Sequence, residues 1–522
     1  MEFINTNNTP RISILRGNIF YTIFEFQTKA DMESSINWMR FKWVIFGAVV
    51  VRLIAVIFSQ GYGMHDDHFL IIEAASSWVD GYDYNNWLPW TEGNTGPDGH
   101  SFSYVGLNYI YFLFMKFLGI VDPKTLMFFN RLIHAALSMI VVIYGIKITR
   151  KFSSEENAMR VGWLIALSWL FPILSVRNIV EIAAMPILVL GFWYLIRERK
   201  GLDFLWAGIL IGFAVSFRYQ IGVFAIGAAA CYFFQWKWKP FLLFCAGILI
   251  VFLITQGLVD FLIWGYPFAE MLGYIVYNMN QGTEYMPNTN YFMYFMVLAG
   301  SMLFPLGALM MVGFFKSWKK YFLIFLPTFI FILFHTLYPN RQERFVLTIL
   351  PFFIILGVIG YDLFKNSTMK ERLWKFSWIA FWVLNIPLLL FATTTYSKKS
   401  RVESMYAIHN NSKKENVILC EGSANVHTSM LPRFYCGNWN TTFIERTDST
   451  LSLTVFDGYE YDYIYFFAEE KLAERIAEYK TIYPKMTLKA KCSPSMIDVL
   501  LRKLNPRNAN EYIEVWETNS KK

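Results

Sequence analysis

The sequence predicts a polytopic α-helical membrane protein of about eleven transmembrane helices, followed by a small α/β domain outside the cytoplasm. Of its 522 residues, 55% are hydrophobic and only 16% are charged, whereas about a quarter of the residues of a soluble domain are charged. The apolar residues come in blocks of about 20, the length that a helix needs to cross the hydrocarbon layer. Lys and Arg lie in short clusters between these blocks, where positive charge sets membrane topology. The net charge of +8 therefore does not indicate a nucleic-acid partner.

Eleven apolar runs supply the predicted helices of a transmembrane module at residues 44–393. An even number of spans fits between consecutive cationic clusters, which places every cluster in the cytoplasm. Residues 1–43, which carry no cleavable signal peptide, are then a cytoplasmic segment, and the C-terminus lies outside. The runs are Val44–Phe58, Leu126–Ile148, Val161–Leu174, Ile179–Ile196, Phe204–Ser216, Ile221–Phe234, Phe241–Trp264, Tyr291–Phe315, Tyr321–Leu337, Arg344–Phe364 and Phe376–Ala392.

The first outer loop, residues 61–125, has an unusual charge pattern. No Lys or Arg occurs between Leu53 and Met115, although the stretch holds seven acids. The apolar run Tyr104–Leu118 inside this loop is interpreted as a helix in the outer membrane interface. The alternative, a twelfth span, would place Arg150 and Lys151 outside. Long ordered outer loops are usually functional. The seven acids are Asp66, Asp67, Glu73, Asp80, Asp83, Glu92 and Asp98.

Residues 394–522 have the composition of a soluble α/β domain. A helix is predicted at Ala468–Tyr479 from its apolar periodicity and charged face. Three cysteines lie in this domain on the predicted oxidising side, so one disulfide can form among Cys420, Cys436 and Cys492. The predicted strands are Asn416–Cys420, Tyr463–Phe467, Met486–Lys491 and Tyr512–Trp516.

The strongest candidate site is the carboxylate pair Asp66-Asp67, which follows the first span directly and is flanked by His65 and His68. A carboxylate desolvated at the membrane interface can act as a general base for a sugar hydroxyl. The plainer alternative is that the two acids only solvate a helix end. The cation-free surroundings favour the catalytic interpretation, with Asp67 as the base and Asp66 as its support.

Several arginines fall at predicted outer helix boundaries on the side of the acidic loop. A guanidinium binds phosphate oxygens in a bidentate manner, so these arginines suit an anionic leaving group. The alternative roles are interface anchoring and, for Arg177, an ion pair with Glu181 four residues later. Arg52, midway along the first span, either lines an internal cavity or packs against backbone carbonyls. The phosphate-binding candidates are Arg177, Arg218, Arg341 and Arg344, and the substrate-binding candidates are His65, His68 and Glu181.

Other chemistry finds no support in the sequence. No Walker loop, GxGxxG turn or HExxH helix occurs, and the five cysteines form no CxxC pair. No metal ligand set and no cofactor is therefore predicted.

The order of these motifs resembles the GT-C class of integral-membrane glycosyltransferases, and most closely the family of GPI-anchor and lipid-linked-oligosaccharide mannosyltransferases. Asp67 matches the Asp of a family His-Pro-Asp-Glu-like motif, although Asp66 and His68 replace its Pro and Glu. The other similar elements are Arg177 with Glu181, Phe217-Arg218, Asn340–Phe345 with Pro351, and Val417–Cys420 with Ser423.

The resemblance implies a polyprenyl-phosphate sugar donor, most closely mannose, a glycan or glycolipid acceptor, and inverting, metal-independent transfer. As part of the mechanism, we expect the C-terminal domain to cover or select the acceptor. The reduced motif match favours a bacterial inner membrane with a periplasmic active site, or the endoplasmic reticulum membrane if the protein is eukaryotic. Two rival classes are a lipid or polysaccharide transporter, which Arg52 favours, and a non-catalytic scaffold, which would not need an uncompensated acidic loop.

Overall fold

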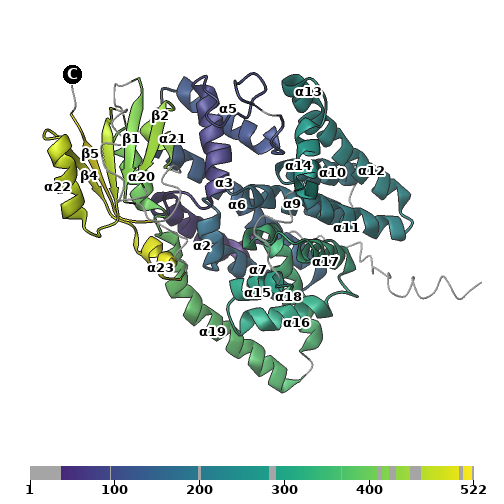
Figure 1. Cartoon of the computed structure of the whole chain (residues 1–522). Coiled ribbons are helices and arrows are strands. Elements are labelled where there is room, and N and C mark those ends of the chain that lie inside the picture. The colour runs from purple at the N-terminus through teal and green to yellow at the C-terminus, as the bar shows by residue number, and fades with distance from the viewer. Residues whose placement is uncertain are drawn as a thin grey trace, which may run out of the picture.

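The computed structural model describes residues 37–94, 96–197, 201–280, 290–365, 367–409, 414–422, 431–446, 460–504 and 510–519. The chain forms a large helical part and a small sheet domain, which lie side by side (Figure 1). The long helix α19 (Thr368–Thr393) runs along the edge of the helical part and leads to the sheet domain. A helical fold with a small sheet domain, as predicted, is confirmed.

Among the described residues, six helical segments are long and apolar enough to cross a membrane. A seventh arises if α15 (Met293–Ser301) and α16 (Leu306–Lys316), bent by 119° at the break between them, count as one span. Three shorter apolar helices are α10 (Leu202–Phe217), α11 (Ile221–Phe234) and α17 (Phe322–Leu337). The six segments are α2 (Trp38–Phe58), α6 (Pro123–Phe152), α9 (Val180–Arg197), α12-η2-α13 (Trp238–Phe252, Leu253–Leu258 and Val259–Trp264), η3-α18 (Glu343–Ile349 and Leu350–Phe364) and α19.

Each of the eleven predicted apolar runs contains helix. One of them, Val161–Leu174, is divided into α7 (Glu155–Leu167) and α8 (Leu170–Leu174), because Ser168 between them has an extended backbone. Length and composition support six or seven crossings, so eleven transmembrane helices stays a prediction.

The acidic outer loop is folded. It contains α3 (His65–Asp67), η1 (His68–Glu73), α4 (Ala74–Val79) and α5 (Phe102–Phe117), the last at the helix predicted for Tyr104–Leu118. Asp80 pairs with Lys116 at 2.7 Å. The negative charge of Asp80 is therefore balanced by Lys116, which lies just outside the cation-free stretch.

Two further carboxylates hold the irregular part of this loop in place. Asp83 accepts hydrogen bonds from the indole N–H of Trp78 and from the backbone of Leu88. Glu270, near the start of α14 (Ala269–Asn280), is fully buried and comes from outside the loop. It accepts hydrogen bonds from the indoles of Trp87 and Trp264 and from the backbone N–H groups of Gly99 and His100, at 2.8–3.1 Å.

The sheet domain has five strands in the order β2-β1-β3-β5-β4. Strand β1 pairs in parallel with β2 and β3, and β5 runs antiparallel to β3 and β4. The four predicted strands and the helix at Ala468–Tyr479 are confirmed. Strand β2 was not predicted, because most of its residues are the polar Thr, Glu and Arg. The elements are α20 (Lys399–Tyr406), β1 (Asn416–Glu421), α21 (Arg433–Cys436), β2 (Thr441–Arg446), β3 (Tyr463–Phe467), α22 (Leu472–Ile482), β4 (Thr487–Cys492), α23 (Met496–Leu504) and β5 (Ile513–Glu517).

The five cysteines are all free thiols in the structure. The disulfide considered for Cys420, Cys436 and Cys492 is therefore not formed. Each of these three side chains is buried, where cysteine packs as a small hydrophobic residue.

Arg52 packs inside the helical part. Its Nε donates to Ser138 Oγ at 2.7 Å, and its terminal nitrogens donate to the carbonyls of Ala48, Ile165 and Ala166 at 3.1–3.3 Å. These acceptors satisfy a guanidinium that would otherwise be costly within a transmembrane helix. The packing alternative is confirmed, and the interpretation of Arg52 as a cavity-lining residue is wrong.

A short segment joins the two parts of the molecule next to Asp66 and Asp67. We call residues 395–398 the junction strap. The backbone N–H of Ser397 donates to the Gln60 carbonyl at 3.0 Å, and Ser397 forms an isolated parallel bridge with Gly61. Gly61 has φ +74°, and a Cβ at this position would lie 1.8 Å from the Ser397 carbonyl oxygen. The strap therefore requires glycine at position 61.

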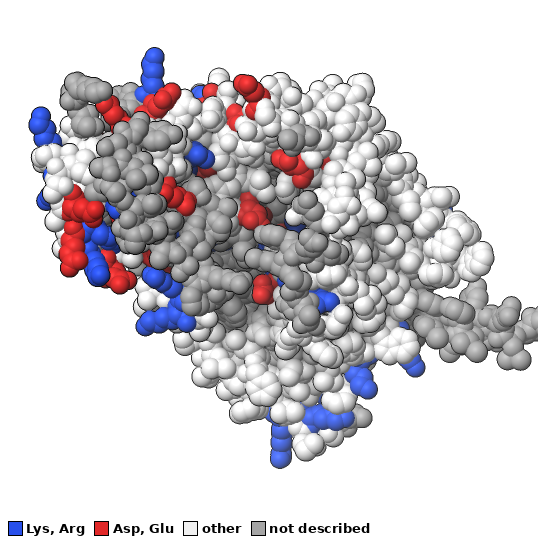
Figure 2. Space-filling model, in the orientation of Figure 1, with Lys and Arg blue, Asp and Glu red and all other residues white. Residues whose placement is uncertain are grey.

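Charged side chains separate along the helical part. Figure 2 shows basic side chains at the lower tip, where α16 ends and α19 begins, and acidic side chains in the upper half. This separation is the one that the positive-inside rule predicts for opposite ends of a membrane protein.

Candidate active site

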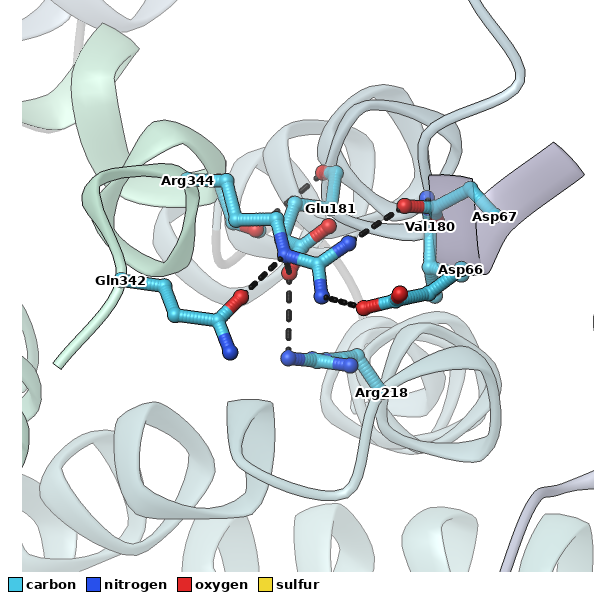
Figure 3. A network of polar contacts seen from close by, with 8 residues as sticks. Asp66, Asp67, Val180, Glu181, Arg218, Gln342 and Arg344 are labelled. Atoms are coloured by element: carbon cyan, nitrogen blue, oxygen red, sulfur yellow. Dashed lines mark hydrogen bonds and ion pairs between the residues drawn. The ribbon is translucent and has the colours of Figure 1, made fainter. Parts of the chain in front are cut away.

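Side chains from four distant segments meet at the site. Asp66 and Asp67 come from α3, Glu181 from the first turn of α9, Arg218 from the end of α10, and Arg344 from η3 (Figure 3). Arg344 lies at the centre of this group. Its Nη1 contacts Asp67 Oδ2 at 2.5 Å, its Nη2 contacts Asp66 Oδ2 at 2.8 Å, and its Nε donates to Gln342 at 2.9 Å. One guanidinium thus orients both members of the acid pair.

Asp67 is the buried member of the pair, with 4% of its surface exposed. Its second carboxylate oxygen accepts a hydrogen bond from the backbone N–H of Val180 at 2.9 Å. Burial and the nearby Glu181 carboxylate raise the pKa of Asp67 to about 6, against the opposing attraction of Arg344. With both oxygens engaged, Asp67 is placed to hold Arg344.

Asp66 is the accessible member. Half of its side chain is exposed, and Arg344 engages only one of its oxygens. A general base must lie within hydrogen-bonding reach of the proton that it accepts. Asp66 meets this requirement better than Asp67.

Glu181 lies between the two arginines. It is 1% exposed, and its Oε1 is 3.1 Å from Arg218 Nη2 and 3.9 Å from Arg344 Nε. Arg218 is more open to solvent than Arg344 and stacks its guanidinium over the Phe345 ring at 4.8 Å. The three carboxylates and two guanidinium groups together carry one negative charge in excess when all are ionised.

Two predicted arginines lie outside this cluster. Arg177 is buried and clamps the junction strap, because its terminal nitrogens donate to the carbonyls of Gln60, Gly61 and Thr395 and to two serine hydroxyls. Arg341 donates its Nε to the Thr336 carbonyl and stacks over Tyr291. The i,i+4 pair between Arg177 and Glu181 is not formed, since Glu181 faces Arg218 and Arg344.

The two predicted histidines contact other aromatic residues. His68 is buried, stacks on Tyr62 and on Tyr435 of the sheet domain, and has Glu73 3.5 Å from its Nε2. It therefore lies at the contact between α3-η1 and the sheet domain. His65 packs its ring against Tyr62 and Phe69. Substrate contacts of both histidines stay predictions.

His100 belongs to the site region although the sequence did not single it out. His100 is exposed, and the charges of Arg218, Arg344 and Asp66 act on its imidazole. Its backbone is held by buried Glu270. The only signal in the sequence was its place in the cation-free loop.

An open, mostly apolar cavity of about 1090 Å³ lies between the acidic outer loop and the helices α5, α10 and η2-α13, and its lining includes none of the five charged residues of the cluster. Its walls include Trp78, Phe102, Phe213 and Ile254, together with Ser103. Gln256 donates to Ser103 in the wall of this cavity and accepts a hydrogen bond from the hydroxyl of Tyr219, the residue after Arg218. Among the described residues, no group of three or more His, Cys, Asp or Glu side chains is arranged to hold a metal ion.

Solved structures share this fold at low sequence identity. ArnT from Cupriavidus metallidurans in the apo state has a TM-score of 0.59 and 9% identity, over 92% of this chain and 98% of that chain. The same ArnT bound to undecaprenyl phosphate has a TM-score of 0.55 and 10% identity, over 91% and 98%. The Archaeoglobus fulgidus oligosaccharyltransferase in complex with Zn and sulfate has a TM-score of 0.51 and 11% identity, over 84% and 69%.

The fold, together with a family model that matches residues 43–430, defines the protein as a membrane glycosyltransferase of the GT-C class. A comparison with curated protein sequences gave no match. The matching model is that of the Alg9-like mannosyltransferase family, and the chain belongs to this family.

Proposed function

We propose that this enzyme transfers a sugar, mannose, from a polyprenyl-phosphate donor to a hydroxyl of a glycan or glycolipid acceptor on the non-cytoplasmic face of the membrane. The observation that carries the proposal is the bridge from Arg344 to Asp66 and Asp67, which unites a base and a phosphate-binding group at one point. The family membership supports mannose. A structure of the similarly folded ArnT with undecaprenyl phosphate supports the donor class.

In the proposed reaction, the acceptor hydroxyl oxygen attacks the anomeric carbon of the donor from the face opposite the phosphate. The bond between this carbon and the phosphate oxygen breaks, so the configuration inverts and polyprenyl phosphate leaves. Asp66 accepts the hydroxyl proton. Arg218 and Arg344 stabilise the charge on the departing phosphate, and preorganised cations act strongly in a water-poor site.

Asp67 has a positioning role in this proposal. The sequence alone assigned the base to Asp67, but its burial and its two hydrogen bonds make Asp66 the better proton acceptor. Asp67 instead fixes the orientation of Arg344. In this proposal the apolar cavity lined by Phe102, Phe213 and Ile254 accommodates the isoprenoid chain of the donor, which enters laterally from the bilayer.

An assay of sugar transfer from a labelled donor tests the proposal. Permeabilised membranes that contain the enzyme should convert radiolabelled polyprenyl-phosphate mannose into a labelled glycan or glycolipid. A donor with another sugar tests the preference for mannose, and a sugar nucleotide tests the need for the lipid. If label moves only across sealed vesicles and no glycosidic bond forms, the protein is a transporter. The packing of Arg52 has removed the feature that favoured that rival.

The pKa of Asp67 predicts how the kcat/KM of the enzyme depends on pH. The carboxylate form of Asp67 pairs with Arg344, and protonation below a pKa of about 6 removes this pair. We therefore expect kcat/KM to fall as the pH drops from about 7 through 6. The asparagine side chain of Asp67→Asn does not titrate, so the residual activity of this variant should not fall as the pH drops through 6. If the same fall persists in Asp67→Asn, the titration belongs to another group.

A further inference from the structure

The cluster lacks a cation for the charge that the donor brings. Its three carboxylates outnumber its two guanidinium groups, and both arginines already face carboxylates. Adding a phosphate would place two or three like charges in excess within a poorly solvated space, where an unpaired charge is costly. A third cation close to Asp66 would lower this excess by one charge.

Lys398 is the candidate for this cation, because its ammonium lies over the ring of Tyr62, four residues before Asp66. It is the last residue of the junction strap, and Ser397 before it is bonded to the chain just ahead of α3. Its backbone adopts a left-handed conformation with φ +53°. Buried Asp498 of α23 fixes this conformation, because its two carboxylate oxygens accept the N–H groups of Lys398 and Lys399 at 2.8 and 3.2 Å.

The Lys398 ammonium has no carboxylate at ion-pair distance among the described residues. It lies over the Tyr62 ring at 4.6 Å, a favourable but weak contact for a cation. Burial and Arg401 lower its pKa to about 7, while Asp498 and Asp66 favour the charged form. Lys398 is thus a partly buried amine that interacts electrostatically with Asp66, without a carboxylate at ion-pair distance in the described part of the chain.

We propose that Lys398 binds the donor phosphate, as a third cation that the junction strap adds to Arg218 and Arg344. The inference rests on the proposed function and deepens it, because it gives the link to the sheet domain a direct role in donor binding. A bound phosphate supplies the missing counter-charge for the ammonium. Lys399, the next residue, is the matched control, because its ammonium influences Cys492 in the sheet domain.

The first measurement is the binding of a short-chain polyprenyl monophosphate to the detergent-solubilised full-length enzyme, with inorganic phosphate as the comparison ligand. Lys398→Gln should weaken binding of the lipid phosphate about 10-fold. Lys398→Arg should restore it to within about threefold, and Lys399→Gln should leave it unchanged. The second measurement is steady-state transfer, in which Lys398→Gln should raise the donor KM while the acceptor KM stays within twofold.

The outcomes separate this inference from the proposed function. If the wild type binds polyprenyl phosphate through Lys398 but transfers no sugar, the proposed function fails and the role of Lys398 stands. Equal binding by the wild type and Lys398→Gln, or equal losses in Lys398→Gln and Lys399→Gln, would overturn the role of Lys398. Failure of the wild type to bind lipid phosphate would overturn both.

Discussion

Asp66→Asn should reduce sugar transfer by at least about 1000-fold, within the range that a positioned general base contributes. The substitution keeps the shape of the side chain and its contact with Arg344 Nη2, but the amide cannot accept the acceptor's proton at neutral pH. Because half of the side chain is exposed, folding and membrane insertion should remain normal. Initial rates with saturating donor, together with the thermal unfolding midpoint, measure both effects.

Two other acids, Asp67 and Asp98, provide the controls for this result. Asp67→Asn should reduce sugar transfer less than Asp66→Asn does, because it loosens Arg344 without removing the base. Asp98 lies on the exposed part of the same loop, so Asp98→Asn should leave the rate of transfer normal. A reversal, with Asp67→Asn inactive and Asp66→Asn active, would return the base to Asp67. Full activity of both variants would remove the acid pair from the mechanism.

Arg344→Lys should lower kcat/KM for the donor by about 100- to 1000-fold, comparable with the loss of a transition-state-stabilising donor. The guanidinium contacts Asp66, Asp67 and Gln342 through three different nitrogens, and one ammonium cannot occupy all three positions. Lysine keeps the charge, so the substitution avoids the roughly 3–5 kcal/mol cost of breaking a buried pair by removing one partner. Donor and acceptor kinetics should be measured separately.

Arg341→Lys is the matched control, because Arg341 is three residues away and similarly buried but lies outside the cluster. It should change donor kinetics by less than threefold. Equal losses in the two variants would indicate that both arginines act through the structure of this segment. A loss confined to Arg341→Lys would restore the phosphate-binding role that the sequence suggested for it.

The convergence of Asp66, Asp67, Arg218 and Arg344 could be anticipated from sequence, because each lies near the end of an apolar run on the same predicted side. The roles of Arg177 and Arg341 could not. Whether an arginine faces a substrate or a backbone carbonyl depends on the packing of segments that are distant in sequence, such as residues 59–61 against 395–397. The same limit applies to Arg52, because two of its three carbonyl partners, Ile165 and Ala166, lie on another helix.

The helices were predictable because apolar length is a property of the local sequence, and four strands were predictable from their short apolar runs. Strand β2 was missed, since its parallel pairing with β1 is made by backbone groups rather than by an apolar pattern. Lys398 and His100 were also missed. Their place near the acid pair depends on Asp498 and Glu270, which act from more than 90 residues away in the chain.

The clamp that Arg177 forms has a consequence for exchanging modules between relatives. The change in composition near residue 394 suggests a natural cut between the membrane portion and the C-terminal portion. A chimaera joined there would take Thr395 and Ser397 from one parent, and Arg177 and Gly61 from the other. A junction after α20, at Ala407, keeps these contacts within a single parental sequence, so recombinants should be designed with that crossover.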